Sequence, residues 1–420
     1  MHSAIEPRGD HVSVQVNRKS KAVASVAGLG LFIMALALRP GIVSVGPLVH
    51  AIQVEFALRH AQAALLTAIP DVCMGFFAIF IPRIGRRFGN DRVILFSLVL
   101  LGLALVLRAL AGSSSSLLLS TFLVGVGVAI SGPLIGGWIK SHFASRAALL
   151  MGIYAAGLGV GATMAAVGSE YVALAEGGWR LAAGVWAILC LFAIVSWQRL
   201  ASIFPSRPHA ERASTAVVSQ SPARTGRAWL IAVYFGLSQF VCYACFAWVG
   251  ESSRELAINS LGPGSNLGLF TAIVAASSLV SGIMTRNTPD RRGWLTGAAV
   301  LSTVGAALLW LSPHALGAIP VMVIALGQGT CFALAMTLPL DNTTSQEEAS
   351  QWTAFMLFVG YLTAALGPFA FGFLRDRTGT FEASYGVLVA ASLALLLLTP
   401  MLKPRAQEAN SRQGAVLRTQ

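Results

Sequence analysis

Long apolar runs follow one another along most of the chain, and short stretches rich in Arg, Ser, Gly and Pro separate them. A bilayer core about 30 Å thick needs roughly 20 helical residues, and twelve runs reach about that length. Residues 93–107 are typical, because they are apolar on every side and lack the alternation of a transmembrane barrel. The pattern therefore predicts an all-α integral membrane protein with twelve transmembrane helices. The approximate spans are 22–49, 62–82, 93–111, 115–139, 147–170, 179–199, 228–250, 266–285, 293–311, 316–340, 350–374 and 381–402.

The predicted helices divide into two halves of six. Residues 201–227 form a long polar stretch with three prolines and several basic residues, which indicates a cytoplasmic linker. The Gly-x-Gly pairs at 125–127 and 327–329 lie 202 residues apart and favour two similar bundles, as in parallel-repeat transporters. We therefore expect an N-terminal tail at 1–21, bundles at 22–200 and 228–402, the linker at 201–227, and a C-terminal tail at 403–420.

Charge is scarce and unevenly placed. Only 11% of the residues are charged and 55% are hydrophobic, whereas soluble proteins carry about 25% charged residues. This composition excludes ordinary soluble enzymes, disordered scaffolds and nucleic-acid modules. Of the 29 Lys and Arg residues, 22 lie in the tails and in the loops on the same side as the tails. By the positive-inside rule, this predicts an inner-membrane protein with both termini cytoplasmic. The net charge of +12 is then an orientation signal and does not indicate a nucleic-acid partner. The loops on the opposite side hold Arg59, Arg108, Arg180, Arg254, Arg375 and Arg377.

Motifs of enzymatic chemistry are missing from the sequence. It has no phosphate-binding G-x-x-x-x-G-K-[ST] run, no H-E-x-x-H and no G-x-S-x-G. The seven histidines fall in tails, loops or span ends. Cys242 and Cys245 have the spacing of a metal or redox pair, but no second pair completes a tetrahedral site. We therefore predict no enzyme activity, no metal site and no cofactor.

Arg39 and Asp71 are the ionisable residues placed deep in the predicted spans. They lie 17 residues before and 15 residues after the middle of the first outer loop, near residue 56, so their depths should nearly coincide. Ionisable groups in a span are costly and usually face a cavity or each other. In one interpretation Arg39 binds an anionic substrate while Asp71 takes up a proton or releases Arg39. In the other, the two form a permanent structural ion pair. Depth alone does not decide whether they touch.

Several other polar or aromatic residues lie deep in the spans. Gln and Tyr in a membrane interior need hydrogen-bond partners and often face an aqueous cavity, which makes them candidates for substrate binding. Hydrogen bonding between helices is the alternative interpretation for each of them. Trp248 lies near the outer end of the seventh span, and we expect it in the interfacial aromatic belt. The substrate-binding candidates beside Arg39 are Tyr154, Gln239, Tyr243, Gln328 and Tyr361.

The chain resembles a known family at several places. The two six-helix halves and their linker are similar to the major facilitator superfamily, and the second loop keeps the Arg-x-Gly core of its motif at 83–85. That motif's Asp position is occupied here by Arg86. A narrower resemblance is to the cyanate/nitroimidazole permease branch. The matching stretches are Leu38-Arg39-Pro40, Ser44-Val45-Gly46-Pro47-Leu48, Met151-Gly152-Ile153-Tyr154, Gly178-Trp179-Arg180, Gly327-Gln328-Gly329, Gly360-Tyr361-Leu362 and Gly367-Pro368.

The resemblance implies transport of a small anionic or polar nitrogen-containing compound by rocker-switch alternating access. It also implies that Arg39, Tyr154, Gln328 and Tyr361 face the substrate cavity. The branch usually has an apolar residue where this chain has Asp71, and this departure suggests a substrate other than cyanate.

The leading hypothesis is a monomeric secondary active transporter of the inner membrane, which carries a small organic anion with protons as the coupling ion. A second hypothesis is a proton-coupled exporter of lipophilic drugs, with Asp71 as the proton carrier. A third is a membrane receptor or sensor that binds a ligand without moving it. The expected soluble segments are short (1–21, 201–227 and 403–420), and this argues against a sensor with an output domain.

Overall fold

The fold was analysed in a computed structural model of the chain. Every regular element among the described residues is a helix. Eleven helical stretches are long and apolar enough to cross a membrane. The shorter apolar helix Ile319–Ala335 is counted as the twelfth. The prediction of an all-α, multi-pass membrane protein with twelve helices is therefore confirmed. The structure describes residues 25–143, 146–206, 221–258, 261–286, 288, 290–314, 316–343 and 345–403.

The N-terminal half begins with a helix over residues 25–38, which continues after a break into short segments. Its remaining elements are α2 (Pro40–Val43), α3 (Val45–Phe56), α4 (His60–Ala63), α5 (Leu65–Phe88), α6 (Asn90–Ala109), α7 (Ser114–His142), α8 (Ala147–Val172), the π-helix η2 (Ala173–Gly177), α9 (Gly178–Gly184) and α10 (Ala187–Ile203).

The C-terminal half has the same alternating course through the membrane. Its elements are the 3₁₀-helix η3 (Pro222–Arg224), α11 (Gly226–Glu255), α12 (Pro263–Met284), α13 (Arg292–Leu311), α14 (Ile319–Ala335), α15 (Leu338–Asn342), α16 (Gln346–Thr378), α17 (Glu382–Leu398) and the 3₁₀-helix η4 (Thr399–Met401).

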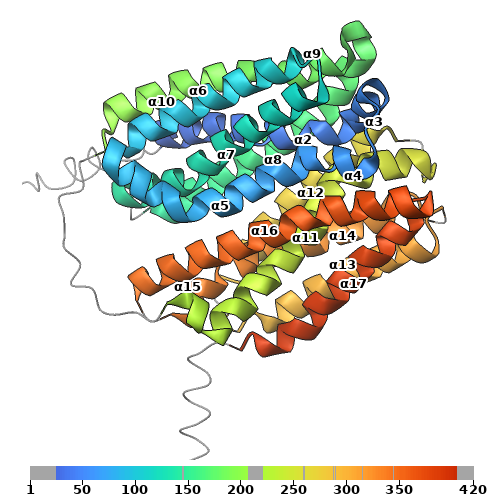
Figure 1. The fold of residues 1–420 in the computed structure, drawn as a ribbon. Coiled ribbons are helices and arrows are strands. Elements are labelled where there is room, and N and C mark those ends of the chain that lie inside the picture. The colour runs from blue at the N-terminus through green and yellow to red at the C-terminus, as the bar shows by residue number, and fades with distance from the viewer. Residues whose placement is uncertain are drawn as a thin grey trace, which may run out of the picture.

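The two halves lie against each other as two layers of helices (Figure 1). Within the halves, α5 and α6 pack on α7, and α11 packs on α16. Between the halves, α16 packs on α5, α12 on α8, and α11 on α3. An even number of crossings places residue 25 and residue 403 on the same face of the molecule. We call that face the tail side and the opposite face the distal side.

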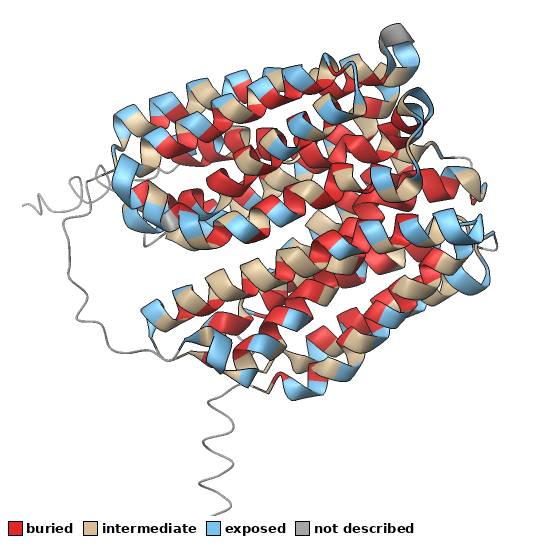
Figure 2. Ribbon diagram, in the orientation of Figure 1, coloured by how far each residue is buried: buried red, intermediate tan, exposed pale blue. Residues whose placement is uncertain are grey.

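The surface of the helices has the character expected for contact with lipid. Buried residues concentrate on the inward faces of the helices, and exposed positions follow their outer faces (Figure 2). Many of the exposed side chains are large and apolar, including Leu103, Phe192 and Leu397. Soluble monomers rarely expose apolar patches of this extent, so these faces fit a hydrocarbon environment.

The first span differs from its predicted boundaries. Its helical course runs from Ser25 to Phe56, whereas the sequence predicted an end at 49, because the polar residues of its last turns resemble a loop. The course is broken at Arg39 and again at Ser44, which separate α2 from its neighbours. Pro40 follows the first break directly, and a proline lacks the N–H that would continue the helical ladder.

The predicted N-terminal tail (1–21), residues 404–420 of the predicted C-terminal tail (403–420) and residues 207–220 of the predicted linker lie outside the described residues. Around the linker, α10 ends at Ile203 and α11 begins at Gly226. The division into bundles at 22–200 and 228–402 stays a prediction.

Candidate functional site

Arg39 lies at the break of the first helix and reaches across to the other half of the molecule. It is the residue directly before α2, and its backbone has φ −89° and ψ −31°. Its guanidinium donates from Nη1 to the hydroxyl of Tyr243 on α11, at 3.1 Å. The residue keeps part of its surface exposed although it lies well inside the helical assembly. The contact therefore places a permanent positive charge between the two halves.

Tyrosines from three helices surround this charge. Arg39 lies within electrostatic range of Tyr154 on α8, Tyr243 on α11 and Tyr361 on α16. The rings of Tyr243 and Tyr361 meet edge to face, with centroids 6.2 Å apart. A guanidinium among tyrosine hydroxyls offers both charge and hydrogen bonds to an anion. The structure thus brings together four of the residues that the sequence singled out.

Asp71 belongs to the same group but does not pair directly with Arg39. It lies on α5 with 0% of its surface exposed, and neither carboxylate oxygen has a hydrogen-bond partner in the described part of the chain. Arg39 acts on Asp71 through its electrostatic field only. An ionised carboxylate without hydrogen bonds is costly to bury. The arrangement is therefore well suited to a carboxyl group that holds a proton.

Gln239 lies one helical turn before Tyr243 on α11, so the two side chains share a face of that helix. It is 3% exposed, and its amide nitrogen has no hydrogen-bond partner among the described residues. A buried donor without a partner is unusual in a native structure. Gln239 therefore stays a candidate for substrate binding.

Gln328 is engaged elsewhere. Its amide oxygen accepts from Ser238 Oγ at 3.0 Å, and its amide nitrogen donates to Ser302 Oγ at 3.0 Å. The residue is 1% exposed, and these bonds join α14 to α11 and α13 inside the C-terminal half. None of its described contacts reaches Arg39. Of the two interpretations left open by the sequence, this geometry favours hydrogen bonding between helices.

We expect Gln328→Ala to lower thermal stability without changing substrate affinity. The variant removes two hydrogen bonds between buried groups, and such bonds within membranes contribute about 0.6 kcal/mol each on average. Melting curves of the purified protein should show a lower transition, while the KM of transport stays within about twofold of the wild type. A large rise in KM would instead place Gln328 at the substrate.

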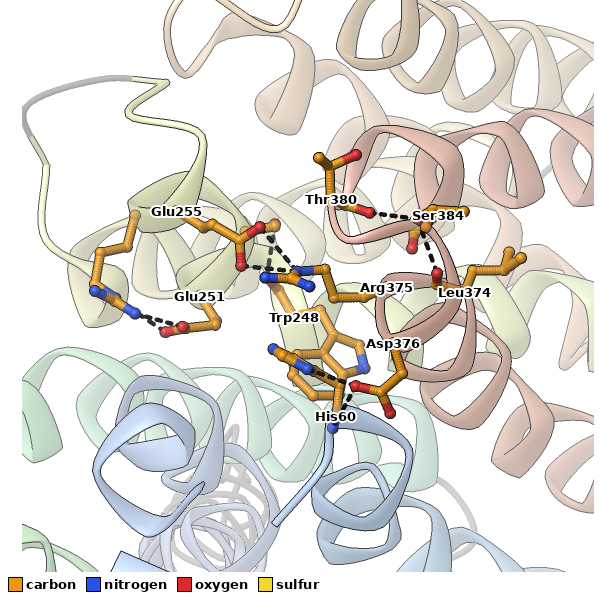
Figure 3. Close-up of polar contacts among 12 residues, drawn as sticks. His60, Trp248, Glu251, Glu255, Leu374, Arg375, Asp376, Thr380 and Ser384 are labelled. Carbon is orange, nitrogen blue, oxygen red and sulfur yellow. Dashed lines mark hydrogen bonds and ion pairs between the residues drawn. The ribbon is translucent and has the colours of Figure 1, made fainter. Parts of the chain in front are cut away.

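Carboxylates join the two halves on the distal side (Figure 3). Asp376, at the end of α16, accepts from the backbone N–H of His60 at 3.0 Å and of Ala61 at 2.9 Å. His60 Nδ1 also lies 2.8 Å from Asp376 Oδ1. Asp376 therefore caps the N-terminus of α4, where the helix dipole favours a negative charge. A residue of the C-terminal half thus holds a helix of the N-terminal half.

A reciprocal contact runs in the other direction. Glu170 on α8 accepts from the backbone N–H and the hydroxyl of Ser265, in the first turn of α12, at 3.0 and 3.2 Å. Each half therefore supplies a carboxylate to a helix N-terminus of the other. We call these two contacts, Asp376 with His60 and Ala61 and Glu170 with Ser265, the distal clamp. The clamp closes the molecule on the distal side.

A further contact between the halves lies near the clamp. His50 Nδ1, at the distal end of the first span, lies 3.2 Å from Glu251 Oε1 and 2.8 Å from Arg254 Nη2 on α11. Glu251 is 3% exposed and forms an ion pair with Arg254 at 2.5 Å. This network adds buried charge to the distal closure.

Asp376→Ala and Glu170→Ala are each expected to favour opening on the distal side. Loss of a carboxylate cap costs about 1 kcal/mol, which corresponds to roughly a fivefold shift between two conformations. Spin labels at Arg59 and Glu382, which are exposed on opposite halves, should report a longer distance in each variant. Arg377→Ala, one residue from Asp376 but outside the clamp, serves as the matched control. Unchanged distances in both clamp variants would contradict the expectation.

Comparison with known proteins agrees with this architecture. The sequence model of the Major Facilitator Superfamily matches residues 27–368. The chain belongs to this superfamily. The cyanate transport protein of Escherichia coli K12 is 31% identical over 380 residues, which cover 90% of this chain and 97% of that protein. The 2-nitroimidazole transporter of the same organism is 27% identical, with 88% and 92% covered. A crystal structure of a peptide transporter with sulfate superposes with a TM-score of 0.73 at 12% identity, covering 90% and 95%.

The comparisons confirm the resemblance to the major facilitator superfamily and to the cyanate/nitroimidazole branch. This member of the superfamily is accordingly a membrane transporter and not an enzyme. In the described part of the chain, no group of three or more His, Cys, Asp or Glu residues is placed to hold a metal ion.

Two residues of the transporter lie where the sequence did not place them. Trp248 was expected in the interfacial belt, but it is 0% exposed and donates from its indole N–H to the carbonyl of Pro368 at 2.8 Å. It packs against His60 and Phe381 beneath the distal clamp. Arg108 was counted with the distal loops, but it is 1% exposed within α6. Arg39 is therefore not the only arginine that lies within the spans. The apolar run at 93–111, which contains Arg108, was the signal in the sequence that this arginine lies within a span.

Proposed function

We propose that this transporter moves a small organic anion or a polar nitrogen-containing compound across the inner membrane by rocker-switch alternating access. Protons are the coupling ion, the protein acts as a monomer, and both termini are cytoplasmic. The skewed distribution of Lys and Arg between the loops supports this orientation. The distal clamp supports a state in which the centre of the molecule is reached from the tail side.

The observation that carries the proposal is the charge of Arg39, which forms no ion pair among the described residues. Its described hydrogen bond is to the neutral hydroxyl of Tyr243, at 3.1 Å, and Asp71 does not neutralise it by direct contact. A substrate anion that binds Arg39 provides the missing countercharge and bridges the two halves. Binding then favours the states in which the halves close around the substrate, because a ligand shifts a conformational equilibrium by its differential affinity.

The relatives support the class of substrate. The proteins with 31% and 27% identity are named as transporters of cyanate and of 2-nitroimidazole, a small anion and a small nitrogen heterocycle. The tyrosine rings beside Arg39 suit a flat substrate, since aromatic rings pack favourably edge to face or offset. Benzoate combines a flat ring with one negative charge and is the probe that fits both features.

The test is a thermal-shift and counterflow series with the purified full chain. Cyanate, acetate, benzoate and 2-nitroimidazole are added singly, and a true ligand raises the melting temperature by mass action. The hits are then measured by counterflow in proteoliposomes. The proposal requires at least one of these small compounds to stabilise the protein and to exchange across the vesicle membrane. Binding without exchange would favour the receptor hypothesis.

A second candidate function is proton-coupled export of lipophilic drugs, with Asp71 as the proton carrier. It is favoured by the full burial of Asp71 and by the lack of described hydrogen bonds to its carboxylate. This hypothesis expects stabilisation by bulky apolar cations and resistance to several unrelated compounds. The thermal-shift series distinguishes the two functions when ethidium is included beside benzoate.

A further inference from the structure

Arg108 is a buried arginine that takes no part in the proposed transport step. It lies near the distal end of α6 and is 1% exposed. Its Nη1 donates to the backbone carbonyl of Gly41 at 2.6 Å, and its Nη2 donates to Thr121 Oγ1 on α7 at 3.3 Å. Its Nε has no hydrogen-bond partner among the described residues. The guanidinium therefore binds a carbonyl and a hydroxyl, both uncharged.

This arrangement is costly for a membrane-spanning helix. A guanidinium stays protonated in proteins, and buried charges normally pair with carboxylates. No described ion pair includes Arg108, and its shortest hydrogen bond is to a main-chain atom. The guanidinium thus binds one particular segment of backbone in place of a carboxylate.

The backbone that Arg108 holds is the broken part of the first helix. Gly41 lies in α2, two residues after Arg39 and directly after Pro40. On its own half, Gly41 fits closely against α7, since a Cβ at this position would lie 2.8 Å from Val124 Cγ1. Arg39 points the other way, to Tyr243 of the C-terminal half. The break therefore lies between two arginines. Arg108 binds its backbone from within the N-terminal half, and Arg39 extends from it to the C-terminal half.

We propose that Arg108 is the positioning residue for Arg39. By holding the Gly41 carbonyl, it fixes the break in the first helix at the angle that presents the Arg39 guanidinium to the space between the halves. A proline next to the break removes one backbone hydrogen bond and leaves the segment free to pivot, and the tether to Arg108 limits this pivot. The expected effect on substrate rests on the proposed function. The orientation of Arg39 by Arg108, which is the structural step of the proposal, does not depend on any ligand.

The structural step is tested by the coupling between Arg39 and Tyr243. Melting temperatures are measured for the wild type, Arg39→Gln, Tyr243→Phe and the double variant, and the departure from additivity is the coupling. The same cycle is repeated in the Arg108→Gln background. We expect the coupling to fall by at least half there. Equal coupling in both backgrounds, or none in the wild type, would overturn the proposal.

Two further variants keep the test decisive if Arg108→Gln does not fold. Arg108→Lys retains the charge and one donor to Gly41. Thr121→Val removes the hydroxyl that accepts from Arg108, together with the bond that this hydroxyl donates to the carbonyl of Leu117 within α7. The coupling should be largely preserved in Arg108→Lys and reduced to an intermediate value in Thr121→Val. Arg180→Gln is the matched control, because Arg180 is a distal arginine that binds Glu55 and the carbonyl of Ala111 instead of the break. If the coupling between Arg39 and Tyr243 were also lost in Arg180→Gln, the loss would be a general effect of removing a distal charge. That result would refute the proposal that Arg108 positions Arg39.

Transport supplies the functional readout. In benzoate counterflow we expect Arg108→Gln to raise KM about tenfold, the effect of one weakened charged hydrogen bond, while the maximal rate per folded molecule stays within about twofold. Arg108→Lys should restore most of the affinity. A merely structural role would instead lower the amount of folded protein and leave KM unchanged. Failure of the wild type to exchange any probe would reject the proposed function, and the coupling cycle would still decide the role of Arg108.

Discussion

Replacing Arg39 by alanine should lower transport of the preferred anion by about 100-fold or more. Removing one partner of a desolvated charge interaction costs about 2–5 kcal/mol, and Arg39 lies between the halves where water competes little. The variant also loses the hydrogen bond between Arg39 and Tyr243. The substrate anion then has no guanidinium to bind when the two halves close around it. Counterflow in proteoliposomes, normalised to the amount of folded protein, measures the effect.

Two variants control this result. Arg39→Lys keeps the charge but loses the planar fork of a guanidinium, so we expect a loss of about tenfold and a higher KM. Arg59→Ala removes an exposed arginine of the distal loop and should leave transport unchanged. Retained transport in both Arg39 variants would remove Arg39 from the substrate site.

Asp71→Asn should abolish proton-driven accumulation while leaving counterflow of the substrate largely intact. An ionised Asp71 offsets the Arg39 charge that acts on it, and a protonated Asp71 leaves that charge available to an anion. Binding of the anion and of the proton then favour each other, and this linkage is reciprocal. Acidifying the side from which substrate enters should therefore increase uptake by the wild type. Uptake by the variant should be nearly independent of pH.

The matched experiment compares uptake with and without a pH gradient in the same vesicles. Glu382→Gln, which removes an exposed carboxylate at the start of α17, should accumulate substrate like the wild type. Gradient-driven accumulation by Asp71→Asn would show that Asp71 carries no coupled proton. Loss of counterflow as well would instead support a direct contact of Asp71 with the substrate.

Most of the fold could be predicted from hydrophobicity alone. A lipid-embedded helix is defined by its length and by its lack of charge, and both are properties of a contiguous stretch of sequence. The ends were less certain. The first span extends to Phe56 because its polar distal turns are stabilised by helical hydrogen bonds and by contacts such as that of Glu55 with Trp179 and Arg180.

The grouping around Arg39 could be predicted only in part. The depths of Arg39 and Asp71 follow from counting residues along two connected helices, but their rotation about the helix axes does not. Tyr243 lies 204 residues from Arg39 in the chain. Residues 241–253 of α11 are all buried, so hydrophobicity does not show which of them contacts Arg39. Gln328 shows the limit clearly, because it resembles a cavity residue in sequence and satisfies its amide within one half.

The distal clamp was not visible in the sequence. Asp376 and Glu170 lie near span ends, where acidic residues are common and usually solvated. Their role depends on the position of a helix N-terminus from the other half of the molecule. Arg108 was misplaced for a related reason, since an arginine near the end of a span can extend towards water or, as here, turn inward to Gly41.

The sequence by itself determined that this protein has twelve membrane-spanning helices, because bilayer thickness and the cost of buried charge act on each segment separately. The major facilitator type came from the resemblance of its motifs to that superfamily. The sequence also singled out Arg39 and Asp71, since charges are rare in such segments. Only the tertiary structure decided which groups face them. Helix rotation, the break at Pro40 and the packing of the two halves brought Tyr243 to Arg39 and Arg108 to the carbonyl of Gly41. They also left the Asp71 side chain without a hydrogen bond from any described residue. These contacts join residues that are distant in the chain, so they depend on how all the helices pack together and not on any one segment.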